Sequence, residues 1–341
     1  MARTVEQRRR TWIDFQDLSS PVNRIALVLY DYGQRPWPYP DRRAARMDWA
    51  VSLYERQLET AQWLDDDRVP AVNLHTGTEI FAEAFGCRVA YPGDNMPYAL
   101  ARVESAADVA KLSVPSVFDG PLGDIFDMTD RIRDRVGPDA VLHLPDIQSP
   151  FDIAALIWKK EDFLIALIDE PEAVHELVAM TRTLLTAFLD EWFRRYGTAY
   201  IAHYPDYYME GGMTLSEDEI GAISPGFFRT YCLDSLNALS DRYGGIGIHS
   251  CANSRHQWEG FRDVRGLRML NLIQPAPVLE EAYAFFAGQT AQMHSFFGEL
   301  RHAPDWAGPG PDAHVVLMES ASDRDSALRA LERMRRPGAR R

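Results

Sequence analysis

Residues 224–251 read SPGFFRTYCLDSLNALSDRYGGIGIHSC, a helix signal followed directly by a strand signal. Ser224 can cap the helix and Pro225 suits its first position, so we expect the helix to begin here and to stop at Gly244. The apolar run Ile246–Ser250 that follows has the length of a buried strand, and polar residues stand at its end. Such a helix–strand unit is typical of an α/β protein.

The same alternation extends over most of the chain. The longest helical pattern, Pro171–Tyr196, places apolar residues at helical spacing and charges on the opposite face. Short apolar runs lie between the helices: Val69–Leu74, Val141–Leu144, Ala199–His203, Ile246–Ser250, Leu267–Leu272 and Val315–Met318. Buried strands that alternate with helices indicate a parallel sheet covered on both faces. About eight such units in one undivided chain predict an α/β fold of the (β/α)8 TIM-barrel type.

The domain organisation follows from this alternation. We expect residues 1–65 to form an N-terminal helical extension packed on the barrel, and residues 66–337 to form the barrel itself, within a single domain overall. A doubly wound open sheet is the alternative architecture. It has less support because neither a GxGxxG nor a GxxxxGK[ST] phosphate loop occurs in the sequence.

Charge and composition narrow the class of partner. The 341 residues carry a formal net charge of −14. A surface this acidic repels phosphate backbones and anionic lipid, so nucleic acid and membrane are poor partners. Three cysteines are too few for a disulfide framework, and no apolar run approaches the roughly 20 residues of a membrane span. With no secretion signal at the N-terminus, we expect a cytoplasmic protein.

Polar side chains stand at the ends of the predicted strands, which is where barrels carry their catalytic groups. His249 and Cys251 follow the strand quoted above, and residues i and i+2 of an extended chain point to the same side. An imidazole and a thiolate that face one point are good zinc ligands. The pair therefore predicts a zinc site, with a buried structural cysteine as the alternative interpretation.

Other strand ends supply groups for acid–base chemistry and for substrate contacts. His203 and Asp206, together with Asp146 after an earlier strand, are candidate catalytic residues. The alternative interpretations are a Tyr-Pro loop with a surface aspartate for the first two, and a helix cap for Asp146. The predicted substrate-binding residues are Gln148, Tyr207 and Asn271.

Several short motifs occur in order from about Asp66 onward: Glu83-Ala84-Phe85-Gly86, Asp146-x-Gln148-x-Pro150-Phe151-Asp152-Ile153, Asp169–His175, Leu215–Asp218 with Ile223-Ser224-Pro225, and Gly244–Cys251. Their order and spacing resemble the uroporphyrinogen decarboxylase superfamily, which includes zinc-dependent methyltransferases that act with corrinoid proteins. The family fold is a (β/α)8 barrel, so the resemblance implies the same architecture as the alternation of helices and strands.

The resemblance also implies a ligand set. In the methyltransferase branch a His-x-Cys pair and a later cysteine on the last strand bind zinc, and His249 and Cys251 match the first two ligands. The last strand here has no cysteine, and Glu319 stands nearest to the missing ligand, so we expect it to bind the metal through oxygen. Ala252 replaces the glycine that usually follows the cysteine. The arginine-rich N-terminal motif of the decarboxylase branch is not recognisable.

Three functions are compatible with these residues. The first is a zinc-dependent methyltransferase-like enzyme that activates a thiol or similar nucleophile of a small-molecule substrate. No DxHxxG corrinoid-binding motif occurs, so any corrinoid would arrive on a partner protein. The alternative is a metal-independent decarboxylase of a small carboxylic acid or pyrrole, in which Asp146 or Asp206 stabilises a cationic intermediate. A non-catalytic accessory barrel is the third. We expect a homodimer, since barrels often pair through helix faces.

Overall fold

The computed structural model describes residues 2–296 and 312–335, so the predicted barrel end at residue 337 lies outside the described residues. The strands are β1 (Arg24–Tyr30), β2 (Ala71–Val72), β3 (Arg88–Ala90), β4 (Tyr98–Leu100), β5 (Val141–His143), β6 (Ala199–Ile201), β7 (Tyr208–Glu210), β8 (Met213–Ser216), β9 (Ile246–Ser250), β10 (Leu267–Gln274), β11 (Ala291–Gln292), β12 (Ser295–Phe296) and β13 (Val315–Ala321). The α-helices are α1 (Val5–Gln16), α2 (Arg43–Trp63), α3 (Ile80–Ala84), α4 (Ala106–Val109), α5 (Gly120–Val136), α6 (Pro150–Ile157), α7 (Lys160–Asp169), α8 (Pro171–Tyr196), α9 (Pro225–Phe227), α10 (Leu233–Tyr243), α11 (Trp258–Arg262), α12 (Ala276–Phe285) and α13 (Arg324–Arg335). Within these ranges no helix has the length and apolar character needed to cross a membrane.

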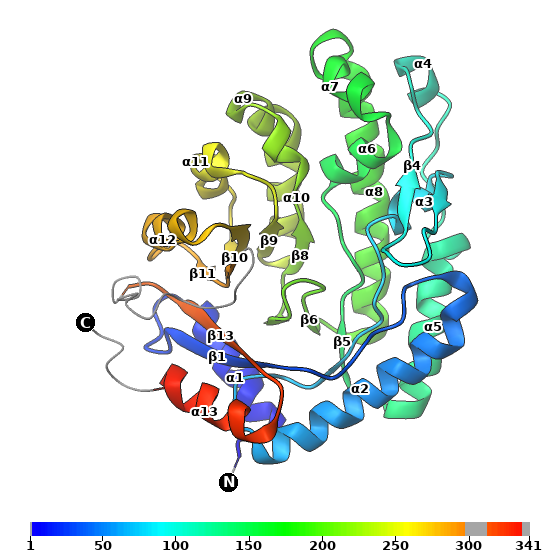
Figure 1. Cartoon of the computed structure of the whole chain (residues 1–341). Coiled ribbons are helices and arrows are strands. Elements are labelled where there is room, and N and C mark those ends of the chain that lie inside the picture. The colour runs from blue at the N-terminus through cyan, green and yellow to red at the C-terminus, as the bar shows by residue number, and fades with distance from the viewer. Residues whose placement is uncertain (1, 297–311, 336–341) are drawn as a thin grey trace.

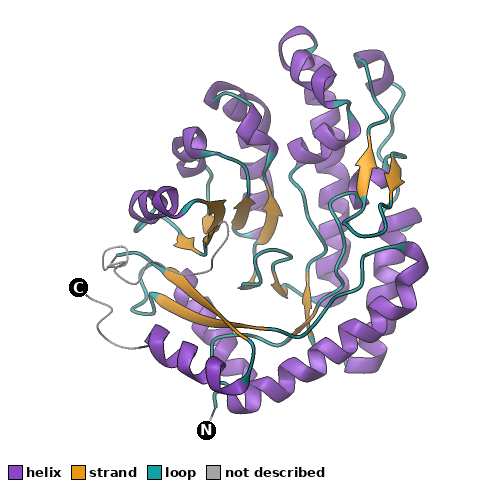
Figure 2. Cartoon of the chain, viewed as in Figure 1, coloured by secondary structure: helices purple, strands orange, loops and turns teal. Residues whose placement is uncertain are grey.

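The strands form two main sheets, and the helices lie around their outside (Figure 1, Figure 2). The larger sheet runs β1-β13-β11-β10-β9-β8, with β12 beside β10, and the smaller runs β2-β5-β6-β7. Within these two sheets every pairing is parallel except that of β7 with β6. Parallel strands that alternate with helices confirm the α/β class predicted from the sequence.

Two buried carboxylates connect the sheets at one edge. The backbone N–H of Ala26 in β1 donates to the Asp67 carboxylate at 2.7 Å, and that of Val28 donates to Asp66 at 3.1 Å. Both aspartates lie just before β2 and are almost completely buried. Their side chains thus satisfy strand donors that a neighbouring strand would otherwise satisfy, because a buried N–H needs a partner.

Backbone bonds connect the sheets at the other edge. Ser216, the last residue of β8, donates to the Ile147 carbonyl and accepts from the Ser149 N–H, both at 2.8 Å. The segment after β5 therefore lies beside β8. The strands follow one another around a barrel, although the ladder is not continuous among the residues that the structure describes.

Residues 1–65 contribute a strand as well as helices. β1 pairs with β13 along its whole length, from Arg24 opposite Val315 to Tyr30 opposite Ala321. α1 begins at a capping box formed by Thr4 and Gln7. Because β1 belongs to the larger sheet, the expected boundary at residue 65 does not separate an extension from the barrel.

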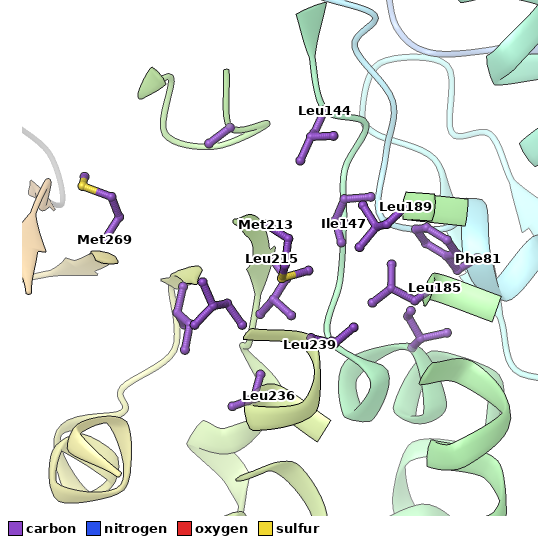
Figure 3. Packing of buried hydrophobic residues seen from close by; sticks show 14 of the residues in the cluster. Phe81, Leu144, Ile147, Leu185, Leu189, Met213, Leu215, Leu236, Leu239 and Met269 are labelled. Carbon is purple, nitrogen blue, oxygen red and sulfur yellow. The ribbon is translucent and has the colours of Figure 1, made fainter. Parts of the chain in front are cut away.

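The apolar stripe predicted in Pro171–Tyr196 packs into the core as α8. Its buried residues are Val174, Leu177, Val178, Thr181, Leu184, Leu185, Phe188, Leu189 and Trp192. Figure 3 shows Leu189 close to Phe81 of α3, and Leu215 of β8 above Leu239 of α10. The same core therefore joins the helix layer to strands of both sheets.

The helix predicted from Ser224 to Gly244 is confirmed at both ends and altered in the middle. The Ser224 hydroxyl accepts from the Phe227 N–H at 3.2 Å, and Gly244 ends α10 with a left-handed φ of 84°. Residues 228–232 form a π-helical turn between α9 and α10. β9 then begins at Ile246 and delivers His249 to the end of the strand.

Candidate metal centre and acid–base pair

His249 is held in one orientation by Asn271 of the neighbouring strand β10. Its Nδ1 lies 2.5 Å from Asn271 Oδ1, and the Asn271 amide nitrogen donates to the Met293 carbonyl. Because the amide nitrogen is engaged, the oxygen faces the imidazole and must accept a proton from Nδ1. The lone pair of the ring is then on Nε2, as in most metal-binding histidines. Asn271, predicted to bind substrate, positions a candidate ligand instead.

Asp218 completes a group of three possible metal ligands with His249 and Cys251. One ligand atom from each of the three residues lies within 4.8 Å of the others. The Cys251 backbone N–H donates to the Asp218 carboxylate at 2.6 Å, which joins the segments after β8 and β9. A nitrogen, a sulfur and a carboxylate oxygen form a donor set that suits zinc. The residues present therefore fit the metal that the sequence predicted.

Hydrogen bonds to a buried carboxyl group, that of Asp152, hold the segment that carries Asp218 in place. Asp152 of α6 accepts from the N–H groups of Asp218 and Glu219, at 2.6 and 3.0 Å. Sequence analysis noted Asp218 only as part of a family motif. It stands two residues beyond β8, so the strand-end rule would have found it if the short strand Met213–Ser216 had been recognised.

The electrostatics of the group favour a bound cation. Partial burial and the neighbouring Asp218 carboxylate raise the pKa of the Cys251 thiol to about 12. The metal-free thiol is therefore protonated at neutral pH, and binding of a divalent cation would displace its proton.

The predicted ligand Glu319 lies elsewhere. On β13 its carboxylate accepts hydrogen bonds from Arg333 of α13, with Nε at 3.0 and 3.3 Å from the two oxygens. The strand position beside it is Val28 of β1, which packs in a cluster with Ala327 and Leu331 of α13. Glu319 thus faces the outer helix layer, whereas Asp218 is the carboxylate whose ligand atom lies within 4.8 Å of those of His249 and Cys251.

The predicted catalytic residues His203 and Asp146 form a partly buried pair. His203 Nε2 lies 3.2 Å from the Asp146 carboxylate and 3.1 Å from the Ser216 hydroxyl. Gln148, predicted to bind substrate, donates to the same carboxylate oxygen at 2.5 Å. Burial raises the pKa of Asp146 to about 6 and lowers the pKa of His203 to about 3. At neutral pH the pair therefore consists of an ionised carboxylate and a neutral imidazole.

The shifted carboxyl group predicts a pH effect on stability. The pKa of Asp146 is raised from 3.8 to about 6 because ionisation of its carboxyl group is unfavourable in the folded state. The stability of the folded protein is therefore highest, as far as this group is concerned, below about pH 4, and part of it is lost as the pH rises through about 6. In Asp146→Asn this loss cannot occur. The free energy of unfolding of the variant, minus that of the wild type, should rise by up to about 3 kcal/mol between pH 4 and pH 7. Urea titrations across this range test the expectation, and a difference that does not change with pH would contradict it.

The remaining two predicted residues are not part of this pair. Asp206 is partly exposed and lies 3.8 Å from Arg68 and 3.9 Å from His143. Tyr207 is buried in the barrel, where its hydroxyl donates to Thr214 at 2.9 Å. Tyr204, which no sequence pattern singled out, is an aromatic neighbour of the candidate ligand His249; the two rings meet edge-on with their centroids 4.8 Å apart.

Gly247 of β9 provides the space for the Tyr207 hydroxyl. A Cβ atom at this position would overlap Tyr207 Oη, which is fixed by the core. Gly247→Ala is therefore expected to lower the free energy of unfolding by about 1–3 kcal/mol. Gly226→Ala, whose Cβ would meet only ordinary contacts in α9, is the control and should change it by less than about 1 kcal/mol. Equal urea midpoints for the two variants would contradict the expectation.

Comparison with known proteins agrees with the fold. The uroporphyrinogen decarboxylase (URO-D) family matches residues 60–283 of this chain. A methyltransferase from Methanosarcina mazei has a similar structure, with a TM-score of 0.66 and 14% sequence identity over 97% of this chain and 98% of that chain. No curated protein matches the sequence. The family match and this likeness confirm the predicted (β/α)8 fold, and at this identity the likeness shows the fold alone.

Proposed function

Because the match over residues 60–283 shows that this chain belongs to the uroporphyrinogen decarboxylase family, we propose that it is a zinc-dependent methyltransferase-like enzyme. The observation that carries the proposal is the group of Asp218, His249 and Cys251, whose ligand atoms lie within 4.8 Å of one another. The group stands where barrel enzymes carry their active sites, at the C-terminal ends of neighbouring strands.

The three residues would hold the metal, and Asn271 would keep His249 Nε2 directed at it. Bound zinc supplies a Lewis acid that lowers the pKa of a coordinated thiol. Asp146 is ionised above about pH 6, so its carboxylate is the group able to take a proton from the thiol at neutral pH. His203 Nε2, 3.2 Å from that carboxylate, would donate to it and fix its orientation.

The methyl donor is proposed to be a corrinoid carried by a partner protein, since the sequence has no corrinoid-binding DxHxxG motif. The acceptor is proposed to be a small thiol. These assignments rest on the donor set of the metal group and on the methyltransferase branch of the family.

Methyl transfer between methylcobalamin and 2-mercaptoethanol tests the proposal with simple probes. The absorbance change of the cobalamin should follow transfer in the zinc-loaded protein. Removal of zinc with a chelator should slow transfer by at least about 100-fold, because a metal Lewis acid supplies several kcal/mol of transition-state stabilisation. Addition of zinc should restore the rate. Equal rates with and without metal would overturn the proposal.

A metal-independent decarboxylase is the second candidate, and the partly buried pair of Asp146 and His203 favours it. A carboxyl group with a pKa of about 6 beside a neutral imidazole can hold or release a proton near neutral pH. Release of carbon dioxide by chelator-treated protein would support this reaction over methyl transfer. Turnover of neither kind would leave the accessory barrel as the remaining hypothesis.

A further inference from the structure

A polar cavity lies next to the segment that carries Asp146. It has a volume of about 330 Å³, is open to solvent on one side, and is lined by residues of α2, α3 and α5 and of the loop that carries Tyr91. Figure 1 shows these three helices together on one side of the molecule. Thr76, which lines the cavity, also accepts a hydrogen bond from the Asp146 N–H at 2.7 Å. The cavity therefore borders the acid–base pair but uses none of the three candidate metal ligands.

Glu79, in the wall of this cavity, has one carboxylate oxygen without a hydrogen-bond partner among the described residues. The residue is only 5% exposed, and the oxygen in question is Oε2. A buried polar atom without a partner costs free energy, so a ligand that satisfied it would bind with a corresponding gain. Burial raises the pKa of Glu79 to about 7, and the Asp146 and Glu83 carboxylates add to the shift.

The charges of the lining favour a positive ligand. Three carboxyl groups line the cavity, those of Glu79, Glu83 and Asp124, beside the guanidinium groups of Arg43 and Arg46. Arg43 forms ion pairs with Asp124, at 3.0 Å, and with Asp127, and not with Glu79 or Glu83.

The charge of Arg46 acts on Glu79, but the hydrogen bonds of its guanidinium group go to other residues. Its Nη2 donates to the carbonyls of Leu74 and His75 at 3.2 and 3.0 Å. Glu79 and Glu83 therefore lack a hydrogen-bonded cation among the described residues, and a positive ligand would reduce the repulsion between them.

The size and the apolar part of the wall point to an organic cation rather than a metal ion. Ile80, Ile125 and Met128 line the cavity together with Pro38 and Pro40, and Tyr91 lines it as well. Hydrocarbon walls suit alkyl groups, and an aromatic ring attracts ammonium groups through its face. A metal ion would require several oxygen ligands around a much smaller space.

We propose that this cavity binds an organic ammonium ion, with the charged nitrogen beside the Glu79 carboxylate and the alkyl groups against Ile80, Ile125 and Met128. The site is independent of the proposed zinc centre. Its position next to Asp146 makes it the place where an amine-containing substrate or effector would enter the barrel.

Isothermal titration calorimetry on the full chain tests the proposal with four probes at equal ionic strength: tetramethylammonium chloride, butylammonium chloride, tert-butanol and sodium acetate. At least one cation should bind saturably, and the neutral alcohol and the anion should bind at least about tenfold more weakly. Glu79→Gln should weaken cation binding by about tenfold or more, as expected for loss of a charged partner. Glu59→Gln, an exposed acid on α2, is the matched control and should bind like the wild type.

Two further variants of the chain make the binding experiment conclusive. Glu83→Gln, at a half-buried position, should weaken binding by roughly threefold and can be measured even if Glu79→Gln does not fold. Cys251→Ser should bind the cations unchanged, so failure of the zinc proposal would not affect this one. Absence of cation binding, preferential binding of acetate, or cation binding that is insensitive to both glutamate substitutions would overturn the proposal.

Discussion

The Cys251→Ser protein is expected to lose nearly all bound zinc, whereas the wild type should bind close to one zinc per chain. Cys251 supplies the one sulfur of the group in which its ligand atom and those of Asp218 and His249 lie within 4.8 Å. Substitution of a residue that only supports a ligand lowers metal affinity by roughly 10–100-fold, so removal of a ligand should cost more. Elemental analysis of dialysed protein measures the stoichiometry, and competition with a chelator measures the affinity.

Matched variants separate the ligands proposed from the structure from those predicted from the sequence. Asp218→Asn should lose zinc, and Glu319→Gln should retain it, because the Glu319 carboxylate is occupied by Arg333. Asn271→Ala should lower the affinity by roughly 10–100-fold through its effect on His249. Cys87→Ala, at a buried thiol, is the control for loss of a cysteine. Zinc retained by Asp218→Asn and lost by Glu319→Gln would contradict the proposed ligand set.

The fold was predictable because the helices that define it show either a long apolar stripe or recognisable capping residues at their ends. The stripe of Pro171–Tyr196 and the capped helix from Ser224 each indicate one secondary structure without reference to the rest of the chain. The strand-end rule likewise singled out His249 with Cys251, His203 with Asp206, and Asp146 with Gln148. His249 and Cys251 follow the same strand, whereas Asp146 and His203 lie close together because β5 and β6 are neighbours.

The direction of single side chains was less predictable. Glu319 and Tyr207 both stand at or near strands, but a short apolar run does not indicate which residues face inward. Asp218 was missed because β8 is only Met213–Ser216, whose Thr214 and Ser216 interrupt the apolar pattern. The strand β1 was absorbed into the predicted extension, although its backbone bonds to Asp66 and Asp67 make it part of the barrel wall.

The Arg8→Ala variant tests whether α1 is integral to the barrel. The Arg8 guanidinium is 1% exposed and bonds Asp66 at 3.0 Å, together with the carbonyls of Arg68, Ala61 and Leu64 at 2.8–3.0 Å. Its loss would remove a donor from each of those carbonyls and the hydrogen-bonded cation of Asp66, whose carboxylate accepts from the Val28 N–H, and would leave Arg68 as a cation near that carboxylate. Removal of one partner of a buried ion pair costs roughly 3–5 kcal/mol, because the remaining charge loses its hydrogen-bonded counterion.

We therefore expect the free energy of unfolding of Arg8→Ala to fall by about 3–5 kcal/mol, measured by urea titration. Arg10→Ala is the control on the same helix, since Arg10 pairs with Asp14 at 3.0 Å but its side chain is 70% exposed. Exposed pairs contribute only about 0–1 kcal/mol. Arg8→Met would show how much of the loss comes from charge rather than volume. If Arg8→Ala were no less stable than Arg10→Ala, α1 would be a dispensable attachment to the barrel.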